Sequence, residues 1–332
     1  MYLWTSNAEN RLRLEMGSSL VQLASSSYGS GHQFAAVGVG KVAGKPILVR
    51  GVNQKYEALG HGVCAETTVM NGFVQQGGIL ERMFLLGPRG AGESCGACLQ
   101  LMTEYAQLSG GLFPWKLPSA NVQIDYFDSD GAWYQRRALD NLLPSPFLNE
   151  RRKTLRQRLN DANLQADPIA PDTILTLLNQ PSVPTKLTST EMPQYLARLA
   201  NDSGLEKRAV LAGLVTTDNQ LFVGIRLHPG GAYTAPAVLT ALAAKAAAGC
   251  VTPLAHLILL GGDDQPTVEI NPARQLLRAH LMQNENGDTW EDLPVDLYNR
   301  SGEMLKSYTL ATLPVMFDDD IHRFILKIGL TQ

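Results

Sequence analysis

The stretch HGVCAETTVM, residues 61–70, places Cys64 two residues ahead of Glu66 at the predicted start of a helix. Two more of the chain's four cysteines, Cys95 and Cys98, follow in GESCGACLQLM, residues 92–102, and open the next predicted helix one turn apart. Thiolates at helix N-termini are stabilised by the helix dipole and by free backbone N–H groups. Two such helices lying side by side would bring three sulfurs to one point.

Three thiolates next to a carboxylate suit zinc. Zinc takes four ligands, and catalytic zinc sites use three from the protein and leave the fourth position open. The remaining cysteine, Cys250, lies in the other half of the chain. Glu66 could reach the open position without being a ligand. The alternatives are a closed site with His61 as the fourth ligand, or plain buried thiols, and neither explains Glu66.

Composition sets the class of protein. The chain has 332 residues, 45% hydrophobic and 18% charged, which is long enough for two domains with proper cores. A net charge of −3 disfavours nucleic acid as a partner, since nucleic acid demands a basic face. Neither a signal peptide nor a membrane span is expected, so a cytoplasmic protein is predicted. In a reducing compartment, thiols are more often metal ligands or catalysts than disulfide partners.

The order of predicted elements occurs twice. The first half reads as a helix, a strand pair, a helix, a strand, a helix and a second strand pair: 7–24, 34–42 with 45–52, 62–76, 79–87, 95–107, and 121–127 with 132–139. The second half repeats the order from its strand pair onward: 210–217 with 221–227, 232–249, 254–262, 271–281, and 295–300 with 304–310. Both close on Leu-Pro-x-x-Phe, at 143–147 and 313–317. Matched order predicts tandem duplication of an α/β unit.

The predicted organisation is a domain over 1–148, a linker over 149–189 and a second domain over 190–332. The linker is expected to be a charged helix followed by a proline-broken stretch that crosses the surface. Aligning the two copies puts Pro236 opposite Cys64 and Val238 opposite Glu66, and it puts apolar residues opposite the other two cysteines, at Ile270 and Ala273. The second domain is therefore predicted to be degenerate and free of metal.

The first copy resembles the cytidine deaminase family, and the double copy with one degenerate half resembles the long, two-domain dimeric form of that family. The matching segments are CAE at 64–66, CGACLQ at 95–100, Phe34 in HQFAAVG, Asn53 in RGVNQKYE, and LLPSPF at 142–147. The resemblance covers most of residues 20–148 and, more faintly, 190–318. It implies two copies of a three-layer α/β/α unit with a mixed central sheet, assembled as a homodimer.

The resemblance also implies roles for individual residues. One zinc ion per chain would be held by Cys64, Cys95 and Cys98, with Glu66 taking a proton from the attacking water and delivering protons to the ring nitrogen and the leaving amine. The implied substrate-contacting residues are Phe34 on the pyrimidine, Asn53 on a ribose hydroxyl, Lys55, Ala65, and Phe147 reaching a neighbouring subunit's pocket. The implied reaction is hydrolytic deamination of cytidine or a related cytosine nucleoside, with release of ammonia.

Two of the departures from the family pattern concern the substrate and the charge of the zinc site. Lys55 stands where the family has glutamate near the ribose site, and Thr67 stands where three-cysteine members carry arginine. Lys55 could point to solvent, or it could meet an anionic substituent such as a phosphate. Two alternatives to cytidine deamination therefore stay open. They are the same chemistry on an anionic or modified amino-heterocycle such as CMP, and a zinc-containing binding protein without catalytic activity.

Overall fold

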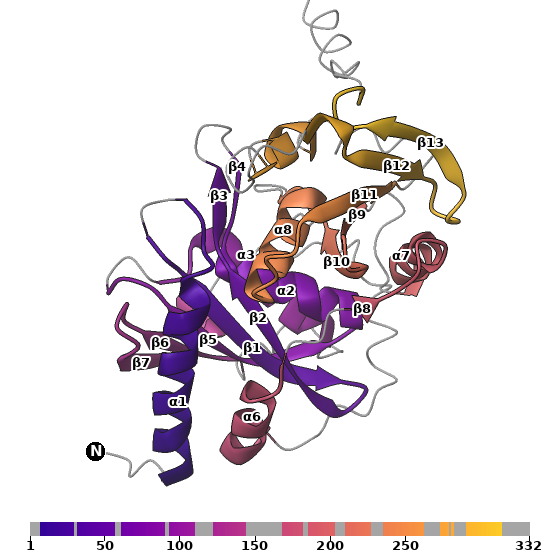
Figure 1. The fold of residues 1–332 in the computed structure, drawn as a ribbon. Coiled ribbons are helices and arrows are strands. Elements are labelled where there is room, and N and C mark those ends of the chain that lie inside the picture. The colour runs from indigo at the N-terminus through magenta and orange to yellow at the C-terminus, as the bar shows by residue number, and fades with distance from the viewer. Residues whose placement is uncertain are drawn as a thin grey trace, which may run out of the picture.

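The computed structural model describes residues 7–29, 32–56, 61–89, 93–109, 122–143, 168–181, 185–202, 210–226, 235–261, 273–278, 280–281 and 290–313. Two mixed sheets dominate this part of the chain, and helices pack on them (Figure 1). No helix in these ranges is both long and apolar enough to cross a membrane. The class is mixed α/β, as predicted.

The first sheet has five strands, and its only parallel pair is β5 with β6. Its spatial order is β2 (Lys45–Val52), β1 (Ala35–Val42), β5 (Ile79–Leu86), β6 (Gln123–Phe127) and β7 (Trp133–Ala138). The predicted hairpin between β1 and β2 is confirmed. Its two turn residues, Ala43 and Gly44, both have positive φ, at 46° and 79°, as two-residue hairpin turns require.

The second sheet repeats this pattern with a short sixth strand at one edge. Its spatial order is β13 (Met304–Thr309), β12 (Pro294–Tyr298), β11 (Leu254–Leu260), β9 (Leu211–Thr216), β10 (Gln220–Ile225) and β8 (Thr185–Lys186). Its only parallel pair is β11 with β12, the counterpart of β5 with β6. Even an irregularity recurs, because the last strand pair of each sheet shifts register near its end, at Phe127 and at Tyr298.

Helices cover both faces of each sheet. The described helices are α1 (Asn7–Ala24), α2 (Ala65–Gln76), α3 (Gly96–Ser109), α4 (Leu139–Leu142), α6 (Pro171–Leu178), α7 (Glu191–Asp202), α8 (Ala237–Ala247) and the short η4 (Trp290–Asp292), with residues 273–278 also helical. Strand β1 shows how the faces divide, because its side chains alternate. Ala36 joins the apolar cluster that contains α2, whereas Val37 and Val39 join the cluster beneath α1.

The two copies match residue by residue where the strand pair meets the next helix. A Cβ added to Gly51 would lie 2.3 Å from the carbonyl oxygen of Ala65, and one added to Gly224 would lie 1.9 Å from that of Ala237. In both copies, strand and helix can approach this closely only because the strand residue is glycine. The sequence alignment of the helices, which pairs Cys64 with Pro236, is therefore in the correct register. These matches are consistent with duplication.

The halves share an interface in which α2 and α8 lie side by side between the two sheets (Figure 1). Asn71 of α2 donates to the carbonyl oxygen of Val223 at 3.1 Å and accepts from the N–H of Ile225 at 2.9 Å. A buried side-chain amide thus pairs with the edge of β10 as a neighbouring strand would. Gln75 also donates to the Val223 carbonyl, at 2.7 Å.

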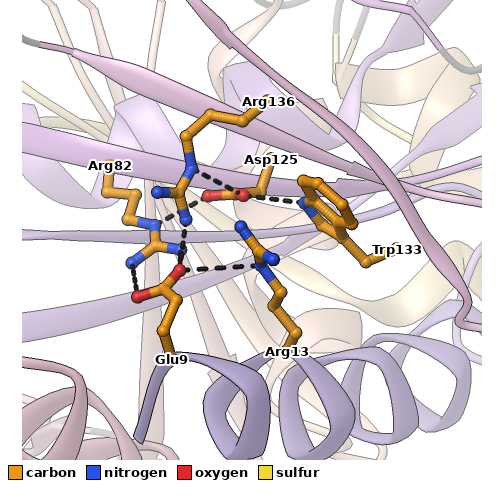
Figure 2. Close-up of polar contacts among 6 residues, drawn as sticks. All are labelled: Glu9, Arg13, Arg82, Asp125, Trp133 and Arg136. Carbon is orange, nitrogen blue, oxygen red and sulfur yellow. Dashed lines mark hydrogen bonds and ion pairs between the residues drawn. The ribbon is translucent and has the colours of Figure 1, made fainter. Parts of the chain in front are cut away.

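Ion pairs connect helix α1 to the first sheet, in a charged cluster that includes Glu9, Arg82, Asp125 and Arg136 (Figure 2). Asp125 is fully buried and accepts hydrogen bonds from Arg82 Nε at 2.7 Å and Arg136 Nε at 2.9 Å. Glu9 of α1 accepts from the same two arginines. The cluster ties one helix and three strands of the first copy together.

The structure corrects two sequence predictions and adds a helix that was not predicted. The helix predicted from Gly62 begins at Ala65, because His61–Val63 forms β4 and pairs with β3 (Gln54–Tyr56). The proline-broken stretch of the predicted linker contains α6, whose apolar side chains Ile174 and Leu175 are buried. Helix α7 was not predicted at all. The predicted charged helix at 149–158 and both Leu-Pro-x-x-Phe endings lie wholly or largely outside the described residues.

Candidate metal and catalytic site

Three cysteine sulfurs meet at the N-termini of α2 and α3. Cys64 follows β4 and is the N-cap of α2, with extended backbone at φ −81° and ψ 157°. Cys95 precedes α3, and Cys98 lies in the first turn of α3. The three sulfur atoms lie within 4.8 Å of one another. The structure therefore brings together the thiols that the spacing of the sequence predicted to converge.

The thiols interact strongly with one another. Mutual hydrogen bonds lower the pKa of Cys95 to about 2 and raise those of Cys64 and Cys98. The backbone N–H of Cys98 also donates to Cys95 Sγ, at 3.5 Å. A helix N-terminus that donates to a sulfur favours the thiolate, which is the form that binds metal. The cluster is graded in exposure, with Cys98 buried, Cys64 half-buried and Cys95 exposed.

This geometry fits zinc. Sulfur ligands about 2.3 Å from a tetrahedral zinc lie roughly 3.8 Å apart, which small side-chain shifts would reach from the observed spacing. Among the described residues, no other His, Cys, Asp or Glu joins the cluster. The side chain of His61, considered as a fourth ligand in the sequence analysis, lies outside what the structure describes. The described donor set is thus three thiols, which is the number that catalytic zinc sites draw from the protein.

Glu66 stands in the first turn of α2 and is 5% exposed. Burial, together with the neighbouring Cys95 sulfur, raises the pKa of Glu66 to about 7. A carboxyl with a pKa near neutrality can both accept and return a proton at neutral pH. The N-terminal position also places it where the helix dipole favours an anion.

Thr67 occupies the place of the family arginine, and it contacts the cluster. Its Oγ1 lies 3.7 Å from Cys98 Sγ, within hydrogen-bonding distance for sulfur, and the residue is 2% exposed. Hydrogen bonds to ligating sulfurs moderate the charge that three thiolates give a metal site. The sequence did not identify this partner, because a threonine on a helix is ordinarily a packing residue.

Four of the five predicted substrate contacts lie within the described residues. Phe34 is half-buried and packs on the cluster of apolar residues that includes Ala65 and Val69. Asn53 is 1% exposed, and its Oδ1 accepts the backbone N–H of Phe34 at 3.0 Å. In this structure the Asn53 side chain fixes the segment that carries Phe34. Ala65 is fully buried as the first residue of α2, and Phe147 lies outside the described residues.

Lys55 of β3 turns toward Phe34. Its Nζ lies 5.9 Å from the centre of the Phe34 ring, and its side chain is half-buried. Of the two sequence interpretations, this orientation disfavours a lysine that extends freely into solvent.

The second copy lacks these reactive groups and supports the first. Val238 and Ala273, which stand opposite Glu66 and Cys98, are fully buried apolar residues. They belong to an apolar cluster that also contains Tyr56 and Val63 from the β3–β4 hairpin of the first copy. Tyr56 Oη lies 3.1 Å from His280 Nδ1. The hairpin that carries Lys55 and leads into Cys64 is thus held by the second copy, which sequence reasoning did not foresee.

Comparison with known proteins gives one kind of match. No protein-family model and no curated protein matches the chain. Among solved structures, cytidine deaminase from Burkholderia pseudomallei is similar at 19% identity and a TM-score of 0.30, covering 39% of this chain and 94% of that one. Cytidine deaminase from Mycobacterium tuberculosis is similar at 22% identity and a TM-score of 0.30, covering 44% and 100%. Cytidine deaminase from Mycobacterium leprae is similar at 21% identity and a TM-score of 0.28, covering 42% of this chain and 100% of that one. At these TM-scores the similarity supports no functional argument. The function is therefore inferred from the residues of the site.

Proposed function

We propose that the chain is a zinc-dependent hydrolytic deaminase acting on cytidine or a related cytosine nucleoside, with its active site in the first copy. The observation that carries the proposal is the meeting of three cysteine sulfurs beside the buried carboxyl of Glu66. A purely structural zinc site needs four ligands and has no use for that carboxyl. A three-ligand site beside a proton-transferring group suits hydrolysis.

Zinc, when bound by Cys64, Cys95 and Cys98, supplies Lewis acidity that makes water a nucleophile near neutral pH. Glu66 takes a proton from water as the water oxygen bonds to the amino-bearing carbon, and it gives this proton to the ring nitrogen. It then moves the proton of the new hydroxyl to the amino group, so that the C–N bond breaks and ammonia leaves. One carboxyl can serve both steps because its pKa lies near neutrality. Thr67 hydrogen-bonds to the Cys98 sulfur, and Phe34 provides an aromatic surface on which a flat heterocycle can stack.

The second copy serves as a scaffold in this proposal. Its residues at the equivalent helix start are apolar, and its contacts hold the β3–β4 hairpin of the first copy in place. Two chains with two copies each would supply the four units of the family that the sequence resembles, so we expect a homodimer.

The test is ammonia release by the zinc-loaded chain from cytidine, deoxycytidine, cytosine and CMP, with Glu66→Gln as the control. We expect Glu66→Gln to lower turnover by about 100- to 10,000-fold while its zinc content stays unchanged. Full activity in Glu66→Gln would show that the proton-transfer role is wrong. Zinc binding without turnover of any cytosine compound would instead favour the non-catalytic zinc-containing binding protein.

A further inference from the structure

The side chain of Lys55 crosses the β3–β4 hairpin in a defined direction. Lys55 pairs with Gly62 across the hairpin, and a Cβ added to Gly62 would lie 3.1 Å from Lys55 Cγ. The aliphatic stem therefore lies directly over the glycine, two residues before Cys64. From there the ammonium reaches a point 5.9 Å from the centre of the Phe34 ring. The stem is packed against the hairpin, and its charged end lies on the side of Phe34.

Among the described residues, the Lys55 ammonium differs from the buried lysines in its partners. Other buried lysines of the chain have partners, since Lys41 Nζ lies 2.7 Å from Glu81 and Lys245 Nζ donates to the Cys250 carbonyl at 2.9 Å. Within the part of the chain that the structure describes, no carboxylate forms an ion pair with Lys55. An ammonium carries three N–H donors and no acceptor. A lysine here, in place of a carboxylate, would favour a substrate group that accepts hydrogen bonds and carries negative charge.

We propose that Lys55 binds a phosphate on the substrate, so that the natural substrate is a cytosine nucleoside monophosphate and not the free nucleoside. This inference rests on the proposed deaminase function and names its substrate class. If a base stacks on Phe34, the Lys55 ammonium, 5.9 Å from the ring centre, lies within reach of a phosphate carried by the sugar of that base. Next to an aromatic ring the ammonium is less hydrated than in bulk water, which strengthens its attraction for a phosphate.

The test is equilibrium binding of cytidine, 5′-CMP and 3′-CMP to zinc-loaded Glu66→Gln chain, which binds without turning over. We expect one of the monophosphates to bind about 10- to 100-fold more tightly than cytidine, the size of a charge-assisted hydrogen bond. Adding Lys55→Gln should abolish this preference, and adding Lys55→Arg should keep most of it. The matched control is Lys45→Gln, an exposed lysine at the start of β2, which should leave the preference unchanged.

Equal affinities for nucleoside and monophosphates, no measurable binding of any of them, or a preference that survives Lys55→Gln would overturn the assignment of Lys55. Ammonia release by the wild-type chain separates this failure from failure of the proposed function. Turnover of cytidine without any phosphate preference would leave the deaminase and remove the role of Lys55. A phosphate preference that depends on Lys55, without turnover of any cytosine compound, would support the anion site and contradict deamination.

Discussion

Asp125→Asn tests the charged cluster that attaches α1 to the first sheet. The carboxylate is fully buried and accepts three hydrogen bonds, from Arg82 Nε at 2.7 Å, from Arg136 Nε at 2.9 Å and from Trp133 Nε1 at 2.9 Å. Asparagine keeps the shape and one acceptor oxygen but removes the charge. Its NH2 group also replaces one acceptor with a donor that faces another N–H, so the change removes the charge and at least one of the three hydrogen bonds.

The magnitude follows from the charges in the cluster. Glu9 and Asp125 face Arg82, Arg136 and Arg13, whose Nε lies 3.7 Å from Glu9, so two anions oppose three cations (Figure 2). Asp125→Asn leaves one anion against three cations in a largely buried place. Breaking a buried ion pair by removing one partner costs about 3–5 kcal/mol. Because Glu9 still contacts Arg82 and Arg136, we expect the lower end, about 3 kcal/mol of unfolding free energy.

Urea unfolding followed by circular dichroism measures this loss. The matched control is Asp172→Asn, which removes an exposed ion pair with Arg11 whose side chains are 69% and 59% exposed. Exposed pairs contribute about 0–1 kcal/mol, so the control should unfold close to wild type. If Asp125→Asn costs less than about 1 kcal/mol, or no more than the control, the cluster does not anchor α1 in the way described.

Two further predictions concern the metal cluster and the interface between the copies. Thr67→Val removes the hydroxyl beside Cys98 Sγ and should weaken zinc affinity about 10-fold, as measured by chelator competition. Thr67→Ser keeps a hydroxyl and should keep the wild-type affinity. Unchanged affinity in the valine variant would contradict the contact. Asn71→Ala leaves the buried N–H of Ile225 without its partner and should cost about 2 kcal/mol of unfolding free energy, while Gln76→Ala, whose amide bonds only within α2, should cost far less. Equal losses in the two alanine variants would show that Asn71 does not bridge the copies.

Local patterns predicted most of the repeated fold. The two β runs at residues 34–42 and 45–52 and the two-residue turn between them were enough to predict a hairpin, and α1 begins and ends where its sequence pattern predicted. The alignment of Cys64 with Pro236 could be made from sequence because both residues immediately precede an apolar helix. Hydrophobic patterns among neighbouring residues, together with the residues that favour turns, were enough to predict these elements.

Two missed elements have different causes. Helix α7 had a readable signal in the Thr-x-x-Glu pattern at 188–191, where Glu191 Oε2 accepts from the backbone N–H of Thr188 at 2.9 Å, as in a capping box. The β3–β4 hairpin had little, because its strands have three residues each and Tyr56 is stabilised by packing on the second copy. Such short strands depend on contacts far away in the sequence, and propensity alone does not predict them.

The sequence likewise predicted one part of the candidate site and missed another. The convergence of Cys64, Cys95 and Cys98 followed from spacing, because helix N-termini dictate where those side chains lie. The contact of Thr67 with Cys98 and the path of Lys55 over Gly62 did not follow. Both depend on how α2 meets α3 and how β3 meets β4, and those tertiary arrangements set side-chain directions that a linear sequence does not reveal.

The central claim is that Cys64, Cys95 and Cys98 hold the zinc that deamination requires, and metal content measured with ammonia release in the same samples tests it most directly. The control is Cys250→Ala, which removes the half-buried cysteine of the second copy. We predict about one zinc ion per chain and full turnover in wild type and Cys250→Ala, and neither zinc nor turnover in Cys98→Ala. A wild-type chain that binds no zinc, or a folded Cys98→Ala chain that keeps both its zinc and its activity, would contradict the account.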